Sequence, residues 1–197
     1  RLTKVTGVQT CALPISNAWT GSFMTGFFPI MMFALPAAAL AIWHTARSSK
    51  RKATGALMVS VALTAFLTGV TEPLEYAFAY VAFPLYAVHA VLTGTSLAVV
   101  NELGIKDGFS FSAGAIDYVL NFGKSAELSG GVLNGPVLLA VIGLVYAVIY
   151  YFLFRFLIVR FDFRTPGREE DDVDAFTTAQ AQAAERTGKN AEAARRA

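Results

Sequence analysis

Long uncharged stretches alternate with short polar segments along most of this chain. The first, Phe23–Trp43, contains about 21 residues without a charge, enough for a helix rising 1.5 Å per residue to cross a hydrocarbon core of about 30 Å. We expect Pro29 and Pro36 to kink that helix. Three more apolar stretches follow, at residues 53–71, 77–100 and 132–154. The pattern predicts an all-α membrane protein with about three to four spanning helices.

Basic residues gather beside two of these stretches, which favours a cytoplasmic location for both clusters. The clusters consist of Arg47, Lys50, Arg51 and Lys52, and of Arg155, Arg160, Arg164 and Arg168. Between two cytoplasmic points the chain crosses the membrane an even number of times, so one of the three intervening stretches is not a simple span. We expect residues 53–76 to form a re-entrant hairpin, because the polar sequence TGVTEP interrupts them. Residues 101–131 are then an external loop or a second, shallow re-entrant element.

Composition and charge narrow the class of protein further. Of 197 residues, 55% are hydrophobic and 15% charged, with a mean hydropathy of +0.51, which is too apolar for an ordinary soluble domain. The formal net charge of +2 is too small to favour a nucleic-acid partner. A single cysteine, Cys11, excludes an internal disulfide, and no Cys/His spacing indicates a metal site. We therefore expect no nucleic-acid partner, no metal and no cofactor.

Three regions of the chain differ in character. Residues 1–16 lack the continuous apolar core of a signal peptide, and Val5–Ile15 can be written in codons that spell a common sequencing-adapter oligonucleotide. We interpret this leader as an artefact ahead of the C-terminal part of a longer protein; the alternative is a natural polar N-terminus. Residues 17–164 form the membrane domain. Residues 165–197 hold few large apolar side chains and are predicted to be a flexible cytoplasmic tail.

The segment TGVTEPLEYAF, residues 68–78, places two carboxylates and a proline within apolar sequence. An ionised acid at the centre of a membrane helix costs about 2.5–3.5 kcal/mol, so it is a functional candidate by default. Glu72 fits this description, beside Thr71 at the break of a discontinuous helix. A carboxylate accepts hydrogen bonds from several hydroxyls and can take a proton from one that becomes a nucleophile, which suits a sugar ligand. The alternative is a loop at the membrane interface, where acids cost little. Nearby aromatic residues offer faces for a sugar ring or for packing: Tyr76, Phe78 and Tyr80.

Four stretches carry a resemblance to a known family. They are FMTGFFPIMMFALPAAALAIWHTA, SVALTAFLTGVTEPLEYAF, GFSFSAGAIDYVL and TPGRE. In this order they resemble the membrane-spanning enzyme IIC subunit of the sugar phosphotransferase system, glucose and N-acetylglucosamine group. The resemblance covers about residues 23–169, and GVTEPLEY is its most specific element. FFPIMMF and GFSFSAGAIDYVL are more similar to the N-acetylglucosamine branch than to the glucose branch.

This resemblance implies sugar transport coupled to phosphorylation in a bacterial inner membrane. In that family the subunit binds the sugar, carries it inward as a homodimer and presents its 6-hydroxyl to a phosphocysteine on the enzyme IIB domain. The acid that hydrogen-bonds the sugar corresponds to Glu72, with Thr71 beside it, and Glu75 belongs to the same motif. We expect Glu72 also to accept the proton of the 6-hydroxyl.

Residues 17–197 depart from the family in two respects. They lack counterparts of the family's N-terminal half, with its sugar-site histidine, and of the IIB cysteine. The implied phosphoryl donor is therefore another chain, and this piece is expected to be inactive alone.

Three further polar residues lie in or beside apolar sequence. We expect His44, next to the first basic cluster, to be an interfacial residue, with a role in docking IIB as the alternative. His89, inside the stretch 77–100, is expected to be a hydrogen-bonded structural histidine rather than a catalytic one. Asp117 lies in FSAGAIDYVL, which matches the family. It is either a buried polar anchor or a substrate-binding residue that borders the sugar pathway.

Two other functions fit the residues taken alone. In an ion-coupled secondary sugar transporter Glu72 would be a proton site, and uptake would continue without a phosphorelay. In a membrane scaffold that transports nothing, replacing Glu72 would cost little beyond stability.

Overall fold

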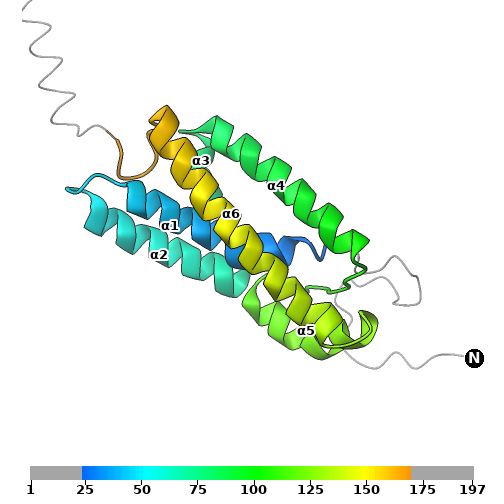
Figure 1. The fold of residues 1–197 in the computed structure, drawn as a ribbon. Coiled ribbons are helices and arrows are strands. Elements are labelled where there is room, and N and C mark those ends of the chain that lie inside the picture. The colour runs from blue at the N-terminus through cyan, green and yellow to red at the C-terminus, as the bar shows by residue number, and fades with distance from the viewer. Residues whose placement is uncertain (1–23, 170–197) are drawn as a thin grey trace, which may run out of the picture.

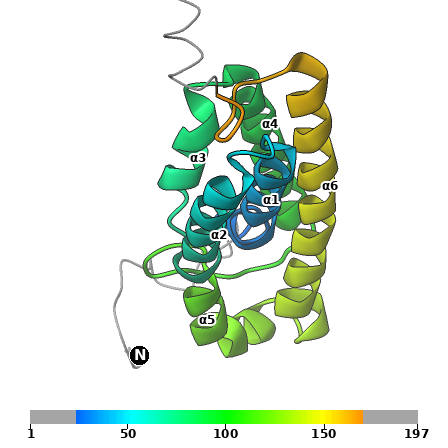
Figure 2. The ribbon, with the colours of Figure 1, turned by 90° about the vertical axis from the view of Figure 1, so that its left-hand side faces the viewer.

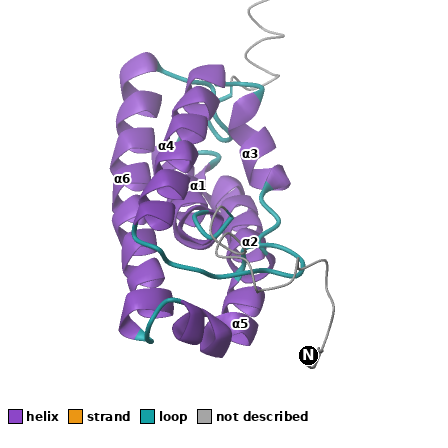
Figure 3. Ribbon diagram, turned by 90° about the vertical axis from the view of Figure 1, so that its right-hand side faces the viewer, coloured by secondary structure: helices purple, strands orange, loops and turns teal. Residues whose placement is uncertain are grey.

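The described part of the chain is a bundle of helices (Figure 1). A computed structural model describes residues 24–169. In chain order its elements are η1 (Pro29–Ala34), α1 (Leu35–Thr45), α2 (Arg51–Thr68), α3 (Glu72–Ala79), α4 (Phe83–Glu102), α5 (Ala115–Leu128), η2 (Leu133–Val137) and α6 (Leu138–Phe161). Residues 24–169 contain no strand (Figure 3). The expected all-α fold is confirmed, whereas the leader 1–16 and residues 170–197 of the expected tail 165–197 lie outside the described residues.

Helix α1 runs through the middle of the bundle, packed against α2 and α6 (Figure 2). Its sequence, LPAAALAIWHT, is rich in alanine, and small side chains allow neighbouring helices to approach closely. The preceding η1 is a π-helical turn that ends just before Pro36, whose ring lacks the N–H that an ordinary helix would use there. The irregularity expected at the prolines is thus a widened turn. Most of α1 is buried, namely Leu35, Ala37, Ala38, Ala39, Ala41 and Ile42.

Helices α4 and α6 are long and apolar enough, by length and composition, to cross a membrane. Helix α6 buries only one stripe, whose members are spaced three or four residues apart: Leu139, Gly143, Tyr146, Tyr150, Phe154 and Ile158. Much of its remaining surface consists of exposed Val, Leu, Ile and Phe side chains, as expected of a helix that faces lipid. Pro29–Thr45 is also apolar but shorter. Within the described residues, these three helices correspond to the spanning helices expected from the sequence.

Helices α2 and α3 form the reversal expected for residues 53–76. Helix α2 runs away from the end at which it starts and stops at Gly69, which has left-handed backbone geometry (φ 72°). After residues 69–71, α3 runs back toward the first end (Figures 2 and 3). The polar sequence TGVTEP therefore marks the turn of a helical hairpin.

One helix boundary expected from hydropathy was wrong. The apolar stretch 77–100 is divided, because α3 ends at Ala79 and α4 begins at Phe83. Pro84 lies in the first turn of α4. Proline has no N–H to donate and favours the start of a helix, so the apolar sequence continues through the turn while the helix does not.

The last apolar stretch also differs from the expectation. Residues 132–154 bend at Gly135, whose backbone leaves helical geometry. Helix α6 then continues past Arg155 to Phe161. Before it, residues 101–131 contain the amphipathic helix α5, which lies at the end of the bundle opposite α3 (Figures 1 and 2).

The two basic clusters meet at the other end of the bundle. The backbone N–H of Arg47 donates to the carbonyl of Gly167 at 3.0 Å. The guanidinium of Arg168 donates to the carbonyl of Thr45 at 3.1 Å and forms an ion pair with Asp162. The segment TPGRE is therefore folded back onto the α1–α2 loop, and both clusters lie on one side of the molecule.

Candidate functional site

The break between α2 and α3 depends on a close approach to a distant loop. A Cβ atom at Gly69 would lie 2.6 Å from the hydroxyl of Ser112 and 2.9 Å from the backbone nitrogen of Ala113, so only glycine fits. The Ser112 hydroxyl donates to the carbonyl of Gly69 at 2.8 Å. The left-handed geometry of Gly69 also disfavours any other residue. The loop before α5 thus braces the turn of the α2–α3 hairpin.

Thr71 and Glu75 form the first polar contact of the site. Thr71 precedes α3, and its carbonyl accepts the backbone N–H groups of Leu74 and Glu75. Its hydroxyl donates to Oε1 of Glu75 at 2.8 Å. Glu72, the first residue of α3, is exposed. Both acids lie in the first turn of α3, where the positive end of the helix dipole favours negative charge.

Glu75 also faces a histidine on the next helix. Nε2 of His89, on α4, lies 3.7 Å from Oε1 of Glu75. Nδ1 of His89 lies 3.0 Å from the hydroxyl of Tyr150 on α6. The rings of Phe78, Tyr86 and Tyr150 surround the imidazole at centroid distances of 5.9, 6.1 and 6.0 Å. Four polar side chains from the break and from three helices are therefore connected, in the order Thr71, Glu75, His89, Tyr150.

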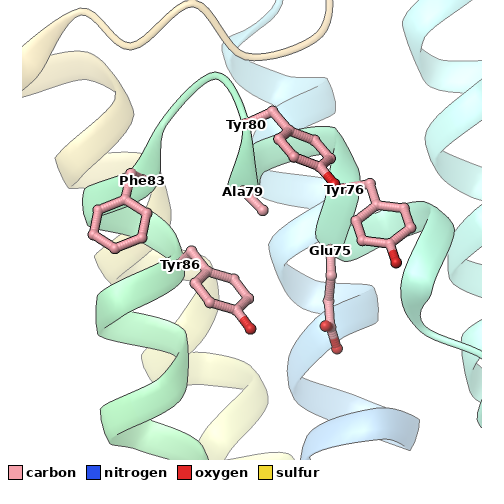
Figure 4. A pocket seen from close by; sticks show the side chains of 6 residues that line it. All are labelled: Glu75, Tyr76, Ala79, Tyr80, Phe83 and Tyr86. Carbon is pink, nitrogen blue, oxygen red and sulfur yellow. The ribbon is translucent and has the colours of Figure 1, made fainter.

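A cavity of about 290 Å³ opens beside this chain of contacts, between α3 and α4 (Figure 4). Its lining consists of Glu75, Tyr76, Ala79, Tyr80, Phe83 and Tyr86. Figure 4 shows the Glu75 carboxylate extending between the hydroxyl-bearing rings of Tyr76 and Tyr86. One acceptor among aromatic faces can take a hydroxylated ring, because ring C–H groups pack on aromatic faces while hydroxyls donate to the carboxylate.

Comparisons with known proteins agree with this architecture. A model of the family described as "Phosphotransferase system, EIIC" matches residues 4–94. The chain is 58% identical over 154 residues to the "PTS system N-acetylglucosamine-specific EIICB component" of Bacillus subtilis (strain 168), covering 78% of this chain and 32% of the relative. The chain belongs to the phosphotransferase system EIIC family. It is also 53% identical over 160 residues to the "PTS system N-acetylglucosamine-specific EIIC component" of Streptomyces coelicolor, covering 81% of this chain and 36% of the relative.

The chain spans about a third of the length of these two relatives. EIIC proteins are membrane proteins of sugar phosphotransferase systems, and the apolar helices agree with that class. Both of these relatives are named as components of a phosphotransferase system, and neither name supports an ion-coupled transporter.

Asp117 holds a loop of the EIIC chain. It lies in the first turn of α5 and is buried. Its two carboxylate oxygens accept backbone N–H groups from Ser110, Phe111 and Ser112 at 3.1–3.2 Å. Since Ser112 in turn contacts Gly69, Asp117 fixes the loop that braces the break without lining the cavity between α3 and α4.

Asp107 is a buried acid that sequence reasoning missed. The residue is 2% exposed, and neither carboxylate oxygen has a hydrogen-bond partner among the described residues. Burial raises the pKa of Asp107 to about 7; the nearby backbone N–H of Gly108 and hydroxyl of Ser125 lower it in part, and the charge of Asp117 acts in the same direction as burial. The hydroxyl of Thr25 bridges the backbone N–H and carbonyl of Asp107 at 3.0 and 2.9 Å. The sequence IKDG resembles an ordinary exposed turn, so no local signal indicates this burial.

Only some of the site residues predicted from the sequence lie together in the structure. Thr71 and Glu75 share a hydrogen bond, and Glu75 reaches the cavity. Glu72 lies one turn away on the same helix and is exposed. Asp117 acts on the supporting loop. Within residues 24–169 no three His, Cys, Asp or Glu side chains are grouped as metal ligands.

The two histidines of the EIIC chain have separate surroundings. His89 is hydrogen-bonded, as expected, and it also faces Glu75, which the sequence did not indicate. Nδ1 of His44 lies 2.9 Å from the hydroxyl of Tyr151. His44 lies in the last turn of α1, next to the first basic cluster.

Proposed function

We propose that this chain is part of a permease that carries N-acetylglucosamine inward and phosphorylates it through the phosphotransferase system. The observation that carries the proposal is the Glu75 carboxylate, which lies beside an aromatic-lined cavity at a break between apolar helices. The named specificity of the two bacterial relatives supports N-acetylglucosamine over glucose. The substrate is thus a neutral hydroxylated ring, which suits one carboxylate among aromatic side chains.

Both acids of α3 contact the sugar. Residues three apart on a helix are neighbours, so a sugar at the mouth of the cavity can contact both Glu72 and Glu75. Thr71 contributes by holding Glu75. Asp117 contributes to binding by holding the loop that braces the break, rather than as a direct ligand.

Phosphoryl transfer requires an activated sugar hydroxyl and a donor from outside the described residues. The sugar O6 attacks the phosphorus of the IIB phosphocysteine, the O6–P bond forms and the S–P bond breaks. The cysteine leaves as a thiolate, and the proton of the 6-hydroxyl passes to Glu72. A carboxylate within hydrogen-bond reach is suited to this general-base role. Every bond and proton of the transfer is accounted for by the sugar, the phosphocysteine and Glu72.

The assembled protein has three kinds of partner. The bilayer surrounds the apolar helices, with the joined basic ends of α1, α2 and α6 on the cytoplasmic side of a bacterial inner membrane, as the basic clusters predict. An enzyme IIB domain approaches from that side, where the tail from residue 165 also begins. The full-length subunit forms a homodimer.

The test is whether uptake requires the phosphorelay. The protein, in the length encoded at its genomic locus, is expressed as the only N-acetylglucosamine permease of a bacterial strain. Uptake of radiolabelled sugar is measured with the relay intact and with its first enzyme deleted. We expect the label to accumulate as sugar 6-phosphate only when the relay is intact. Uptake of unmodified sugar that persists on a proton gradient without the relay would overturn the proposal and favour an ion-coupled transporter.

A competition assay tests the choice of sugar. Unlabelled N-acetylglucosamine should reduce phosphorylation of the labelled sugar at lower concentration than unlabelled glucose does. The reverse order would assign the permease to glucose.

A further inference from the structure

A buried chain of polar contacts ends at the Glu75 carboxylate. Tyr150 is fully buried and His89 is 7% exposed, whereas the Glu75 side chain is 23% exposed and lines the cavity. Neither Tyr150 nor His89 belongs to the cavity lining. Any effect of these two residues on a ligand in the cavity is therefore indirect, through a lining residue that His89 contacts: Glu75, which Nε2 faces, or Tyr86, whose ring packs near the imidazole.

The hydroxyl of Tyr150 has two possible acceptors, and the geometry selects one. Nδ1 of His89 lies 3.0 Å away, and the backbone carbonyl of His89 lies 3.3 Å away. The same carbonyl already accepts the hydroxyl of Thr93 at 2.9 Å. Nδ1 is the closer acceptor and has no other donor among these contacts. The Tyr150 hydroxyl is therefore assigned as the donor to Nδ1.

This hydrogen bond determines the tautomer of His89, and therefore whether the nitrogen that faces Glu75 carries a proton. A neutral imidazole carries one N–H, and accepting a hydrogen bond at Nδ1 leaves that proton on Nε2. Nε2 is the atom that faces Oε1 of Glu75, at 3.7 Å. In the opposite tautomer the lone pair of Nε2 would face the carboxylate, which is repulsive. Tyr150 thus favours the tautomer that attracts Glu75.

Both holding contacts of Glu75 are made on the same oxygen. The hydroxyl of Thr71 donates to Oε1 at 2.8 Å, and Nε2 of His89 faces that same atom. Oε2 is then the acceptor left for a ligand in the cavity. The ring of Tyr86, which lines the cavity, also lies 6.1 Å from the imidazole. Packing between these two rings therefore restricts the orientation of both side chains.

We propose that Tyr150 and His89 are positioning residues that hold the Glu75 carboxylate with Oε2 toward the cavity, as an acceptor for a sugar hydroxyl. The inference rests on the proposed function, because it requires that Glu75 binds the sugar. On this inference, Tyr150 on α6 and His89 on α4 affect the affinity for the sugar although neither residue contacts it.

The experiment compares two tyrosines of the same buried stripe on α6. Tyr150→Phe removes the hydroxyl that contacts His89. Tyr146→Phe is the matched control, because the Tyr146 hydroxyl contacts Thr95 at 3.0 Å instead and its ring is also buried. Both variants are made in the protein expressed from its own locus. Phosphorylation of N-acetylglucosamine and thermal unfolding of the purified protein are measured for each.

We expect Tyr150→Phe to raise KM about tenfold relative to Tyr146→Phe, with similar melting temperatures and little change in kcat, because one hydrogen bond to a charged group is misaligned. In a Glu75→Gln background the same substitution should change KM less than twofold, since its effect passes through that carboxylate. His89→Gln, whose amide N–H can still donate to Glu75, should retain more affinity than His89→Leu.

The outcomes separate this inference from the proposed function. If Glu75→Gln impairs sugar affinity while Tyr150→Phe behaves like Tyr146→Phe, the positioning role is wrong and the proposed sugar site stands. If Tyr150→Phe raises KM equally with and without Glu75, its effect is merely structural and the inference fails. If Glu75→Gln leaves KM unchanged in a relay-dependent permease, Glu75 does not bind sugar and the inference fails with it.

Discussion

The carboxylate of Glu75 faces the imidazole of His89 across the α3–α4 interface, with Oε1 and Nε2 3.7 Å apart. Both groups would be costly in an apolar helix if unpaired. Their pairing, with Thr71 and Tyr150 at the two ends, explains how the hairpin carries an acid beside a membrane-spanning helix. It also leaves the acid accessible from the cavity.

The break at Gly69 should not tolerate a side chain. Gly69→Ala combines a positive φ with a contact of 2.6 Å to Ser112. We expect it to lower the free energy of unfolding by more than about 2 kcal/mol and to abolish sugar phosphorylation. The measurement is thermal unfolding of the purified protein together with phosphorylation in membranes.

Gly104 provides the matched control for Gly69. It has a similar φ of 69°, but a Cβ atom there would meet nothing within 4 Å. Gly104→Ala should therefore cost only the backbone term of about 1–2 kcal/mol and leave activity in place. Equal destabilisation by the two substitutions would show that the approach of Ser112 to Gly69 does not matter.

Asp117 should act on stability more than on sugar contacts. Asp117→Asn removes the charge that accepts three backbone N–H groups, and hydrogen bonds to charged groups contribute about 1.5–3 kcal/mol. We expect the melting temperature to fall by several degrees, with KM raised only to the extent that the loop on Gly69 loosens. A large increase in KM at an unchanged melting temperature would instead make Asp117 a direct sugar ligand.

The buried Asp107 should make stability depend on pH. Burial raises its pKa from 3.8 to about 7, so the folded protein binds this proton more tightly than the unfolded chain does. The resulting stabilisation is present below about pH 4 and is lost as the pH rises through 7. We expect the melting temperature of the wild type, relative to Asp107→Asn, to fall between pH 5 and pH 8. Parallel pH profiles for the two proteins would contradict a buried, protonated Asp107.

The two ends of the bundle should lie on opposite sides of the membrane. Ser48 is exposed in the α1–α2 loop, and Lys124 is exposed on α5 at the other end. In the locus-encoded protein with its other cysteines replaced by serine, Ser48→Cys should react with an impermeant maleimide only from the cytoplasmic side. Lys124→Cys should react only from the outer side. Labelling of both cysteines from one side would contradict this orientation.

The sequence predicted the elements that depend on local properties. The lengths of the apolar stretches were enough to expect an all-α membrane fold, and the glycine, the proline and the acid of TGVTEP were enough to expect the break after Thr68. The family motif also led to Thr71 and Glu75, which the structure joins by a hydrogen bond.

Properties that depend on packing between distant segments were not predictable from the pattern. Glu75 and His89 lie on different helices, and their contact depends on the turn before Pro84. The hydropathy of the sequence does not indicate this turn, because its residues are apolar. Asp107 occupies a sequence typical of exposed turns, and its burial depends in part on Thr25, far away in the chain.

Equilibrium binding of radiolabelled N-acetylglucosamine to the purified, locus-encoded protein tests the central claim most directly. The compared variants are Glu75→Gln, Glu72→Gln and a control, Glu127→Gln, which changes an exposed acid on α5. We expect both α3 variants to weaken binding about tenfold or more while the α5 variant binds like the wild type. Unchanged affinity in both α3 variants would contradict a sugar site at the break between α2 and α3.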